Sequence, residues 1–440
     1  MSFKDDKNVE DLKKGPYISP ELDEIFYKKK TMSLSIREGY FGGLTQTLAD
    51  QFITPYALNL QTSPTQLGIM SSLLGITSPI GQIIGSNLMK KSSRRNIVVK
   101  GVFLQALMWP SIILLGLFAL NGWIVSILPI FLICFYIIYN FFGNATGPSW
   151  FSLMGDIVPE DQRGRYFSKR SLFITAISFS ISIVASIALD RFERLDRVYI
   201  GFFIIFFIAF ISRLISVFFL TRHYDPPFKI EKHSYVSFKK FLKQIPNNNF
   251  GIFTLFMTFI YFSVNIGAPF IGIYMLEELN FNYIEYVMVN LSMPLLSILF
   301  YPIFGYISDK YGNVLLLRIC GLSLPIVPIL WLFLNEPLPL IFGAQLMSAF
   351  AWSGTNLAVS NFIYDNINTQ QRGFYVAYNS LLFGTGSLLG GLLGSFLLHI
   401  VPIIFISIYE TLFLISGICR LFFVFIFLFR IKEVRVKKNG

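Results

Sequence analysis

Long uninterrupted apolar runs, each of about 20 residues, restrict the possible folds of this chain more than any other feature. A helix of that length crosses the ~30 Å hydrocarbon core of a bilayer. Of the 440 residues, 54% are hydrophobic and only 14% are charged, whereas soluble domains carry about 25% charged residues. Because lipid offers the backbone no hydrogen-bonding partner, each run is expected to be helical. The sequence therefore predicts an all-α integral membrane protein.

Twelve such spans can be counted, and most are joined by short connections. The long connection, 222–248, is polar and basic and separates the sixth span from the seventh. We therefore expect an N-terminal tail (1–33), a six-helix bundle (34–222), a central loop (223–248), a second six-helix bundle (249–430) and a C-terminal tail (431–440). The spans are expected near 36–60, 66–89, 97–120, 123–153, 167–189, 199–221, 249–276, 284–307, 314–334, 338–364, 375–399 and 403–430.

One pattern occurs once in each half of the chain: Asp, six residues, Arg-Gly, one residue, Tyr. The first copy occupies residues 156–166, and the second copy, at 365–375, follows at an offset of 209 residues. An internal repeat at this distance indicates that the chain is a tandem of two long halves.

Basic residues are distributed unevenly among the connections. Of the 36 Lys and Arg residues, 31 fall in the two tails and in the loops that follow the even-numbered spans. Such loops are cytoplasmic in membrane proteins, so we expect a multi-pass protein of the cell membrane with both termini in the cytoplasm. The same distribution accounts for the net charge of +11. Anionic lipid headgroups are a sufficient partner for this charge, and we expect no nucleic-acid partner.

Residues that catalyse reactions or bind cofactors are not grouped in any recognisable motif. The three histidines and three cysteines show no metal-ligand spacing, and no glycine-rich phosphate-binding loop ends in Lys-Ser or Lys-Thr. We therefore expect no catalytic residue, metal or cofactor, and the chain is not expected to be an enzyme.

The twelve spans, the 6+6 repeat and the basic central loop resemble the major facilitator superfamily over residues 34–430. The most specific segment is Gly305-Tyr-Ile-Ser-Asp309-Lys-Tyr-Gly312, which is similar to the cytoplasmic signature of that family. The first-half copy keeps Gly85 and a basic cluster but has Met89 where the signature has Asp. The resemblance implies two pseudo-symmetric six-helix bundles around a central cavity.

The resemblance also implies an inner gate at the cytoplasmic ends of the helices. Glycines there allow close helix packing, and charged pairs can form in one state and break in another. Asp156 and Asp365 are the expected partners of the other gate charges. Alternatively, these residues are ordinary interfacial charges. The gate is expected to contain Gly85, Arg94, Asp156, Arg163, Gly305, Asp309, Gly312, Asp365 and Arg372.

In this family, spans 1, 4, 7 and 10 line the cavity. Independently, each of these spans carries two polar or polar-tipped aromatic residues four positions apart, and hence on one helical face. Polar groups facing lipid are costly, so these pairs are expected to point inward and to bind a substrate with hydrogen-bonding groups. The alternative is that they join helices. The pairs are Gln46 and Asp50, Asn140 and Asn144, Tyr261 and Asn265, and Trp352 and Asn356.

Asp50 is the ionisable member of this set. Removal from water favours a neutral carboxyl group, which suits a proton carrier, while a charged Asp50 could be the counter-ion of a cationic solute or of a structural Arg or Lys. Arg213 and Arg420 lie toward the inner ends of spans 6 and 12, where their long stems are expected to reach the headgroups. Glu410 is assigned no role.

These observations favour secondary transport of a small organic solute, by import or efflux, through alternating access. Proton coupling through Asp50 is a second hypothesis. One alternative is a uniporter in which Asp50 only orients the substrate. Another is a receptor or lipid-handling protein that does not transport. The expected partners are the solute, the bilayer and protons, and the expected state is a monomer.

Overall fold

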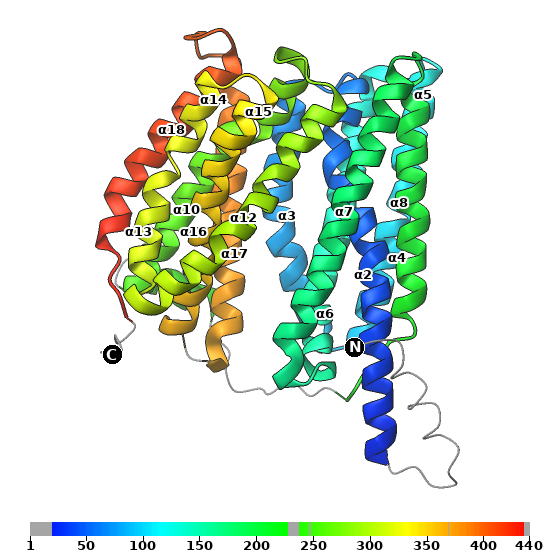
Figure 1. The fold of residues 1–440 in the computed structure, drawn as a ribbon, viewed down its shortest axis with the longest axis vertical. Helices are drawn as coiled ribbons and strands as arrows, with labels where there is room; N and C mark the ends of the chain where they lie inside the picture. Colours follow the sequence, from blue (N-terminus) through cyan, green and yellow to red (C-terminus); the bar gives the residue numbers. More distant parts are fainter. Residues whose placement is uncertain (1–19, 228–236, 246–247, 368, 435–440) are drawn as a thin grey trace.

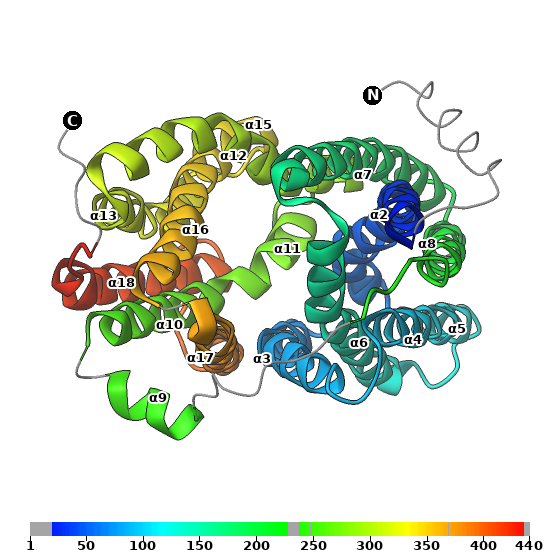
Figure 2. The ribbon, with the colours of Figure 1, turned by 90° about the horizontal axis from the view of Figure 1, so that it is seen from below.

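Described in the computed structural model are residues 20–227, 237–245, 248–367 and 369–434. Within these ranges the chain is an all-α bundle whose long helices run roughly side by side (Figure 1). Seen from below, the helices form two groups, one from each half of the chain (Figure 2). The first described helix begins, and the last one ends, toward the lower end of Figure 1. We use "lower end" and "upper end" in that sense throughout.

The helices follow the predicted order of spans, and several spans consist of more than one helical segment. The first half contains α2 (Pro20–Asn59), α3 (Pro64–Leu88), α4 (Arg94–Ala106) with α5 (Met108–Leu120), α6 (Leu128–Ile157), α7 (Arg163–Glu193) and α8 (Val198–Leu220). A short helix, α9 (Phe238–Gln244), lies in the central connection. The second half contains α10 (Asn249–Gly267) with α11 (Ile271–Ile273), α12 (Tyr283–Tyr311), α13 (Asn313–Ser323) with α14 (Ile326–Phe333), α15 (Pro337–Leu340) with α16 (Leu346–Asn366), α17 (Thr369–Leu397) and α18 (Ile408–Phe427).

Several span boundaries differ from the prediction, and local chemistry explains the start of α18. Helix α2 begins at Pro20 rather than near residue 36, so it extends below the bundle into the segment expected to be a tail. Helix α18 begins at Ile408 rather than near 403, because Ser407 and Glu410 form a capping box there. Glu410, to which no role was assigned, therefore fixes the start of α18, and it also accepts a hydrogen bond from the Tyr274 hydroxyl (2.9 Å).

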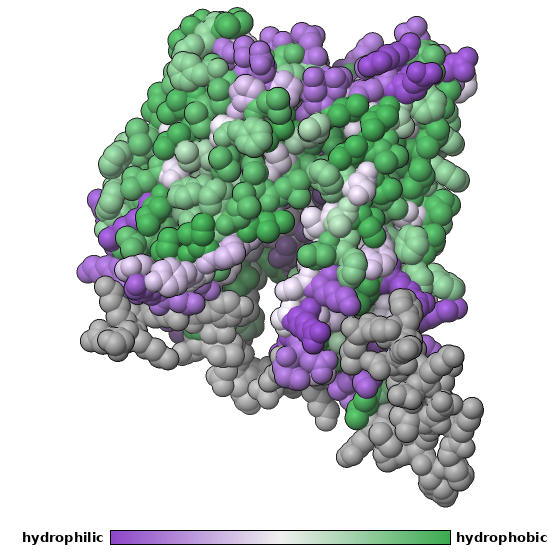
Figure 3. Space-filling model, viewed as in Figure 1, coloured by the Kyte–Doolittle hydropathy of each residue, from purple (hydrophilic) through white to green (hydrophobic). Residues whose placement is uncertain are grey.

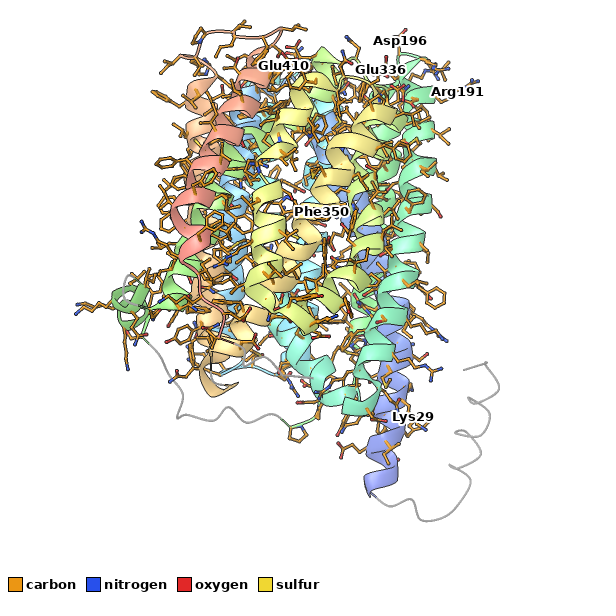
Figure 4. The ribbon with its side chains drawn as sticks, turned by 60° about the vertical axis from the view of Figure 1, so that its left-hand side comes forward. Lys29, Arg191, Asp196, Glu336, Phe350 and Glu410 are labelled. Carbon is orange, nitrogen blue, oxygen red and sulfur yellow. The ribbon has the colours of Figure 1, made fainter. Side chains whose placement is uncertain are left out.

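An apolar band surrounds the bundle. Large apolar side chains cover its sides, while hydrophilic residues gather at both ends (Figure 3). Of the labelled residues in Figure 4, the charged Arg191, Asp196, Glu336 and Glu410 lie at the upper end, Lys29 lies low, and Phe350 lies between. Ten helical stretches in the described residues are long and apolar enough to cross a membrane. Helices α2 and α16 are not among them, and both carry pairs of the predicted cavity residues.

Arg420 is one residue that the structure places differently from the prediction. It was expected to reach the lipid headgroups, but it is only 5% exposed. Its Nη1 donates to the carbonyl oxygen of Leu324 (3.0 Å), where α13 ends just before Pro325. Because proline has no N–H group, the helix is interrupted at this point. The expectation was therefore wrong, and Arg420 stabilises a helix break inside the second half.

Candidate functional site

The space between the halves is open at the lower end in the space-filling view (Figure 3). On the first-half side, Gln46 and Asp50 of α2 are exposed, although Leu48 and Ala49 between them are fully buried. The hydroxyl of Tyr136, on α6, donates to Oδ1 of Asp50 (3.3 Å). Asp50 therefore faces α6 rather than lipid, as its polar character requires.

The asparagine pair of α6 is held by hydrogen bonds along and between helices. Nδ2 of Asn140 donates to the carbonyl of Tyr136 (3.0 Å), and Nδ2 of Asn144 donates to the carbonyl of Asn140 (2.9 Å). Oδ1 of Asn144 accepts a hydrogen bond from Ser78 of α3 (2.7 Å). Asn144 thus joins α6 to α3 in this conformation, which is the interhelical role expected as the alternative to substrate binding.

The corresponding residues of the second half form a polar and aromatic group. The rings of Tyr261 and Trp352 lie 5.7 Å apart between centroids, which brings α10 against α16. Nδ2 of Asn265 donates to Oγ of Ser387 on α17 (3.1 Å). Asn356 is exposed although it lies within α16, one helical turn from Trp352.

The two halves meet where α3 packs against α17. Any side chain at Gly384 would collide with the carbonyl oxygen of Gly75, so the two backbones approach closely there. Ser78, the partner of Asn144, lies one turn from Gly75, and Ser387, the partner of Asn265, lies one turn from Gly384. The Asn144–Ser78 pair of the first half and the Asn265–Ser387 pair of the second half therefore lie on opposite sides of the contact between α3 and α17.

At the upper end, hydrogen bonds tie the halves together. Oδ1 of Asp190, at the end of α7, accepts the backbone N–H of Tyr283 at the start of α12 (2.8 Å). Nδ2 of Asn59, at the end of α2, lies 3.1 Å from the Tyr283 hydroxyl oxygen. Thr65 Oγ1 and His399 Nε2 lie 2.9 Å apart, between α3 and the end of α17. We call these contacts the upper seam.

At the lower end, the first-half gate residues form an ionic cluster around a buried arginine. The side chain of Arg94 is 1% exposed, and its Nη1 lies 2.6 Å from Asp156 Oδ2. Its Nε lies 3.7 Å from Asp225 Oδ1, at the beginning of the central connection. Arg163, which was expected to be the partner of Asp156, instead donates to the carbonyls of Gly155 (2.5 Å) and Val158 (3.3 Å). In this conformation Asp156 pairs with Arg94, the arginine that begins α4.

The second-half gate residues show a different arrangement. Asp365, at the end of α16, accepts a hydrogen bond from Nδ2 of Asn313 (2.7 Å), and Asp309 lies exposed in the last turn of α12. The side chain of Arg372 lies outside the described residues, so its expected pairing is not addressed. Gly312 ends α12 with φ of +97°, a backbone conformation that favours glycine.

The repeated glycine of the signature has different surroundings in its two copies. A Cβ at Gly85 would overlap the carbonyl oxygen of Ala145, so α3 and α6 touch at this point. A Cβ at Gly305 would have no heavy atom within 4 Å among the described residues. The close helix packing expected of both glycines is therefore present only at Gly85 in this conformation.

The upper seam was not predicted. Asp190 stands among interleaved acids and bases, a pattern typical of a solvated loop, and nothing in the sequence pairs it with Tyr283 far along the chain. Tyr136 was missed because a tyrosine within an apolar span is usually a core residue. A signal was nevertheless present, since Tyr136 and Asn140 are four residues apart on the helix that carries Asn144.

Comparison with known proteins adds to this geometry. The family model described as Major Facilitator Superfamily matches residues 40–288 and 253–440. The sequence has no match among curated proteins. Similar solved structures include the nucleoside transporter NupG, with a TM-score of 0.65 and 15% identity, covering 92% of this chain and 100% of that one.

Two further similar structures are described as inward-facing. A bacterial homologue of the iron transporter ferroportin has a TM-score of 0.68 and 15% identity, covering 92% of this chain and 99% of that one. A bacterial homologue of the lysosomal transporter Spinster, also unoccupied, has a TM-score of 0.65 and 11% identity, covering 94% of this chain and 97% of that one. At these identities the likeness shows the fold alone.

Proposed function

Because this chain belongs to the major facilitator superfamily and is a membrane transporter, we propose that it moves a small organic solute across the membrane by alternating access. The two bundles that move against each other are residues 34–222 and 249–430. Basic residues concentrate at the lower end, so we assign that end to the cytoplasm. The protein acts as a monomer of the cell membrane.

One observation carries this proposal: polar side chains within the bundle are exposed, while the two halves are separated at the lower end (Figure 3) and joined by hydrogen bonds at the upper end. Gln46, Asp50 and Asn356 are exposed in helices flanked by buried residues, whereas Asp190 and Tyr283 join the halves above them. This arrangement supports the assignment of an inward-open state. A solute entering from the lower end meets hydrogen-bonding groups before it meets the upper seam.

Alternating access then requires two linked changes. The contacts of the upper seam must break, and the lower ends of the halves must come together around the gate residues. Among the described contacts, those of Arg94 and Arg163 stay within the first bundle and the beginning of the central connection, and that of Asp365 stays within the second bundle. We therefore propose that Asp309 and Arg372 of the second half, together with the Arg94–Asp156 cluster of the first, form inter-bundle contacts when the lower end closes.

Proton coupling is the second layer of the proposal. Asp50 is the carboxylate among the paired cavity residues, and its hydrogen bond to Tyr136 connects two helices that line the cavity. Protonation would change that hydrogen bond and the charge presented to the solute. In a uniporter, by contrast, Asp50 would only orient the substrate.

The test is transport by purified protein in proteoliposomes. Candidate solutes are first found by a thermal-shift screen, because a ligand that binds the native state raises apparent stability. Saturable counterflow of a hit without ATP supports the proposal. If no ligand that stabilises the protein undergoes counterflow, the receptor or lipid-handling alternative is favoured. Dependence of uptake on an imposed pH gradient separates proton coupling from uniport.

A further inference from the structure

A cavity of about 400 Å³ lies toward the lower end of the first half, between α2, α4, α6, α7 and α8. Three charged side chains line it: Glu38 from α2, Arg170 from α7 and Arg213 from α8. Gln46, one of the expected substrate-binding residues, lines it as well. The cavity therefore shares Gln46 with the proposed substrate site.

Glu38 neutralises one of the two arginines. Its Oε2 lies 3.1 Å from Nη2 of Arg170, and the two side chains are 8% and 16% exposed. Its Oε1 accepts a hydrogen bond from Ser216 (3.0 Å). The Arg170 guanidinium carbon also lies 4.6 Å from the ring centroid of Trp150. Arg170 is thus paired, stacked and fixed in position.

Arg213 has no comparable acidic partner. Its Nε donates to Oε1 of Gln105 (2.8 Å), and its Nη2 donates to the same oxygen. A neutral amide orients the guanidinium group but does not balance its charge. Among the described residues, neither Nη1 of Arg213 nor Nη1 of Arg170 has a hydrogen-bond acceptor. Snorkelling, expected for Arg213, therefore does not describe its surroundings, because the side chain lines a cavity inside the bundle.

Two glycines of α2 make room for these charged groups. A Cβ at Gly42 would lie 2.9 Å from Glu38 Oε1 and 3.1 Å from Arg213 Nη1. A Cβ at Gly39 would lie 2.8 Å from Arg170 Nη2. The absence of side chains at Gly39 and Gly42 therefore leaves space on the surface of α2 for the three charged side chains. Asp50 lies eight residues beyond Gly42, about 12 Å further along the axis of α2. Among the described residues it forms no ion pair with these arginines.

We propose that this cavity binds the carboxylate of a small organic monoanion, with Nη1 of Arg213 and Nη1 of Arg170 as the donors. Two arginines and one glutamate leave one unbalanced positive charge, and guanidinium groups match carboxylates in geometry. A phosphate monoester is disfavoured, because its second negative charge would lie beside Glu38. This inference rests on the proposed transport function and specifies its substrate class.

The test measures binding in detergent by thermal shift. The probes are benzoate and hexanoate, their neutral amides benzamide and hexanamide, and phenyl phosphate. Both carboxylates should raise the melting temperature at lower concentrations than the amides or the phosphate. Arg213→Gln should weaken the apparent Kd for carboxylates about 10- to 100-fold, as expected for a lost charge-assisted hydrogen bond. Arg213→Lys should restore part of the affinity.

Arg222→Gln is the matched control, because Arg222 is exposed two residues beyond α8 and lies over the ring of Phe218. It removes the same charge near the same membrane surface and should leave the affinity unchanged. If the amides bind as well as the carboxylates, if no carboxylate stabilises the protein, or if Arg213→Gln binds normally, the inference is overturned.

Counterflow of labelled benzoate and of any neutral or cationic hit distinguishes this inference from the proposed function. Carboxylate binding that depends on Arg213 but is not followed by counterflow would contradict transport and retain the site. Counterflow of a neutral or cationic solute without carboxylate binding would retain transport and overturn the site.

Discussion

Replacement of Asp190 by alanine should shift the protein from the state that is open at the lower end, proposed here to be inward-open, toward the state that is open at the upper end. The Asp190 carboxylate accepts the first backbone N–H of α12 across the two halves and is only 6% exposed. A hydrogen bond to a charged group contributes about 1.5–3 kcal/mol. Because 1.4 kcal/mol corresponds to a factor of ten, Asp190→Ala should lower the ratio of inward- to outward-open molecules about 10- to 100-fold. Asp190→Asn keeps a hydrogen-bond acceptor and loses mainly the interaction of the negative charge with the helix dipole, which contributes about 0.3–1 kcal/mol. The ratio of the two states should therefore change only a few fold.

The assay is a distance measurement across the lower end. Spin labels at Lys91 and Lys310, both exposed and on opposite halves, are introduced after the cysteines at 134, 320 and 419 have been replaced. Pulsed electron–electron resonance then gives the populations of long and short distances. Asp190→Ala should increase the short-distance population and Asp190→Asn should do so less. An unchanged distribution in a folded Asp190→Ala protein would refute the role of the upper seam in holding the upper end closed.

Three further predictions concern the lower gate and the cavity. Gly85→Ala should lower the free energy of unfolding by about 1–3 kcal/mol, because the new methyl group overlaps a carbonyl of α6. Gly305→Ala should be nearly neutral, and thermal melting of the two variants tests this difference. Arg94→Ala should lower the free energy of unfolding by about 3 kcal/mol. This value is near the lower limit for a broken buried ion pair, because its partner Asp156 is 49% exposed. A smaller effect in thermal melting would show that the cluster does not stabilise the protein. Asp50→Asn should abolish the dependence of uptake on an imposed pH gradient while leaving expression normal, and unchanged proton-driven uptake would remove Asp50 from the coupling mechanism.

The helical organisation could be predicted because membrane insertion restricts the choices so strongly. Apolar runs long enough to cross lipid must be helices, and the order of spans follows directly from them. The start of α2 at Pro20 was missed because a helix that projects beyond the bilayer has no apolar signal. Pro325 marks the break between α13 and α14 in the sequence. The hydrogen bond from Arg420 to the carbonyl oxygen at this break depends on packing between spans 9 and 12. That contact involves residues almost a hundred positions apart and leaves no local pattern.

The candidate site was predictable to the extent that polarity within a span is costly. That argument identified Asp50 and the asparagine pairs, because each is conspicuous in an apolar helix. It did not identify Glu38 or Arg170, which lie near the ends of their spans and look like the interfacial charges that determine topology. Their pairing depends on α2 and α7 packing together, with Gly39 providing the space. Sequence polarity can locate an unusual residue but not the partner that it contacts on another helix.

His223 provides a test of the buried lower cluster that does not require a known substrate. Burial, together with the nearby positive charges of Arg170 and Arg95, lowers the pKa of this histidine from 6.5 to about 4. The native state therefore keeps the ring neutral between pH 6.5 and 4, whereas the unfolded chain binds a proton there. Native stability should fall by up to about 3 kcal/mol as the pH decreases through this window. In detergent, the melting temperature of His223→Met should depend less on pH between 4 and 6.5 than that of the wild type. Equal pH dependence in wild type and His223→Met would mean that the ring is not held neutral, and that the beginning of the central connection is not packed against the first half as the structure describes.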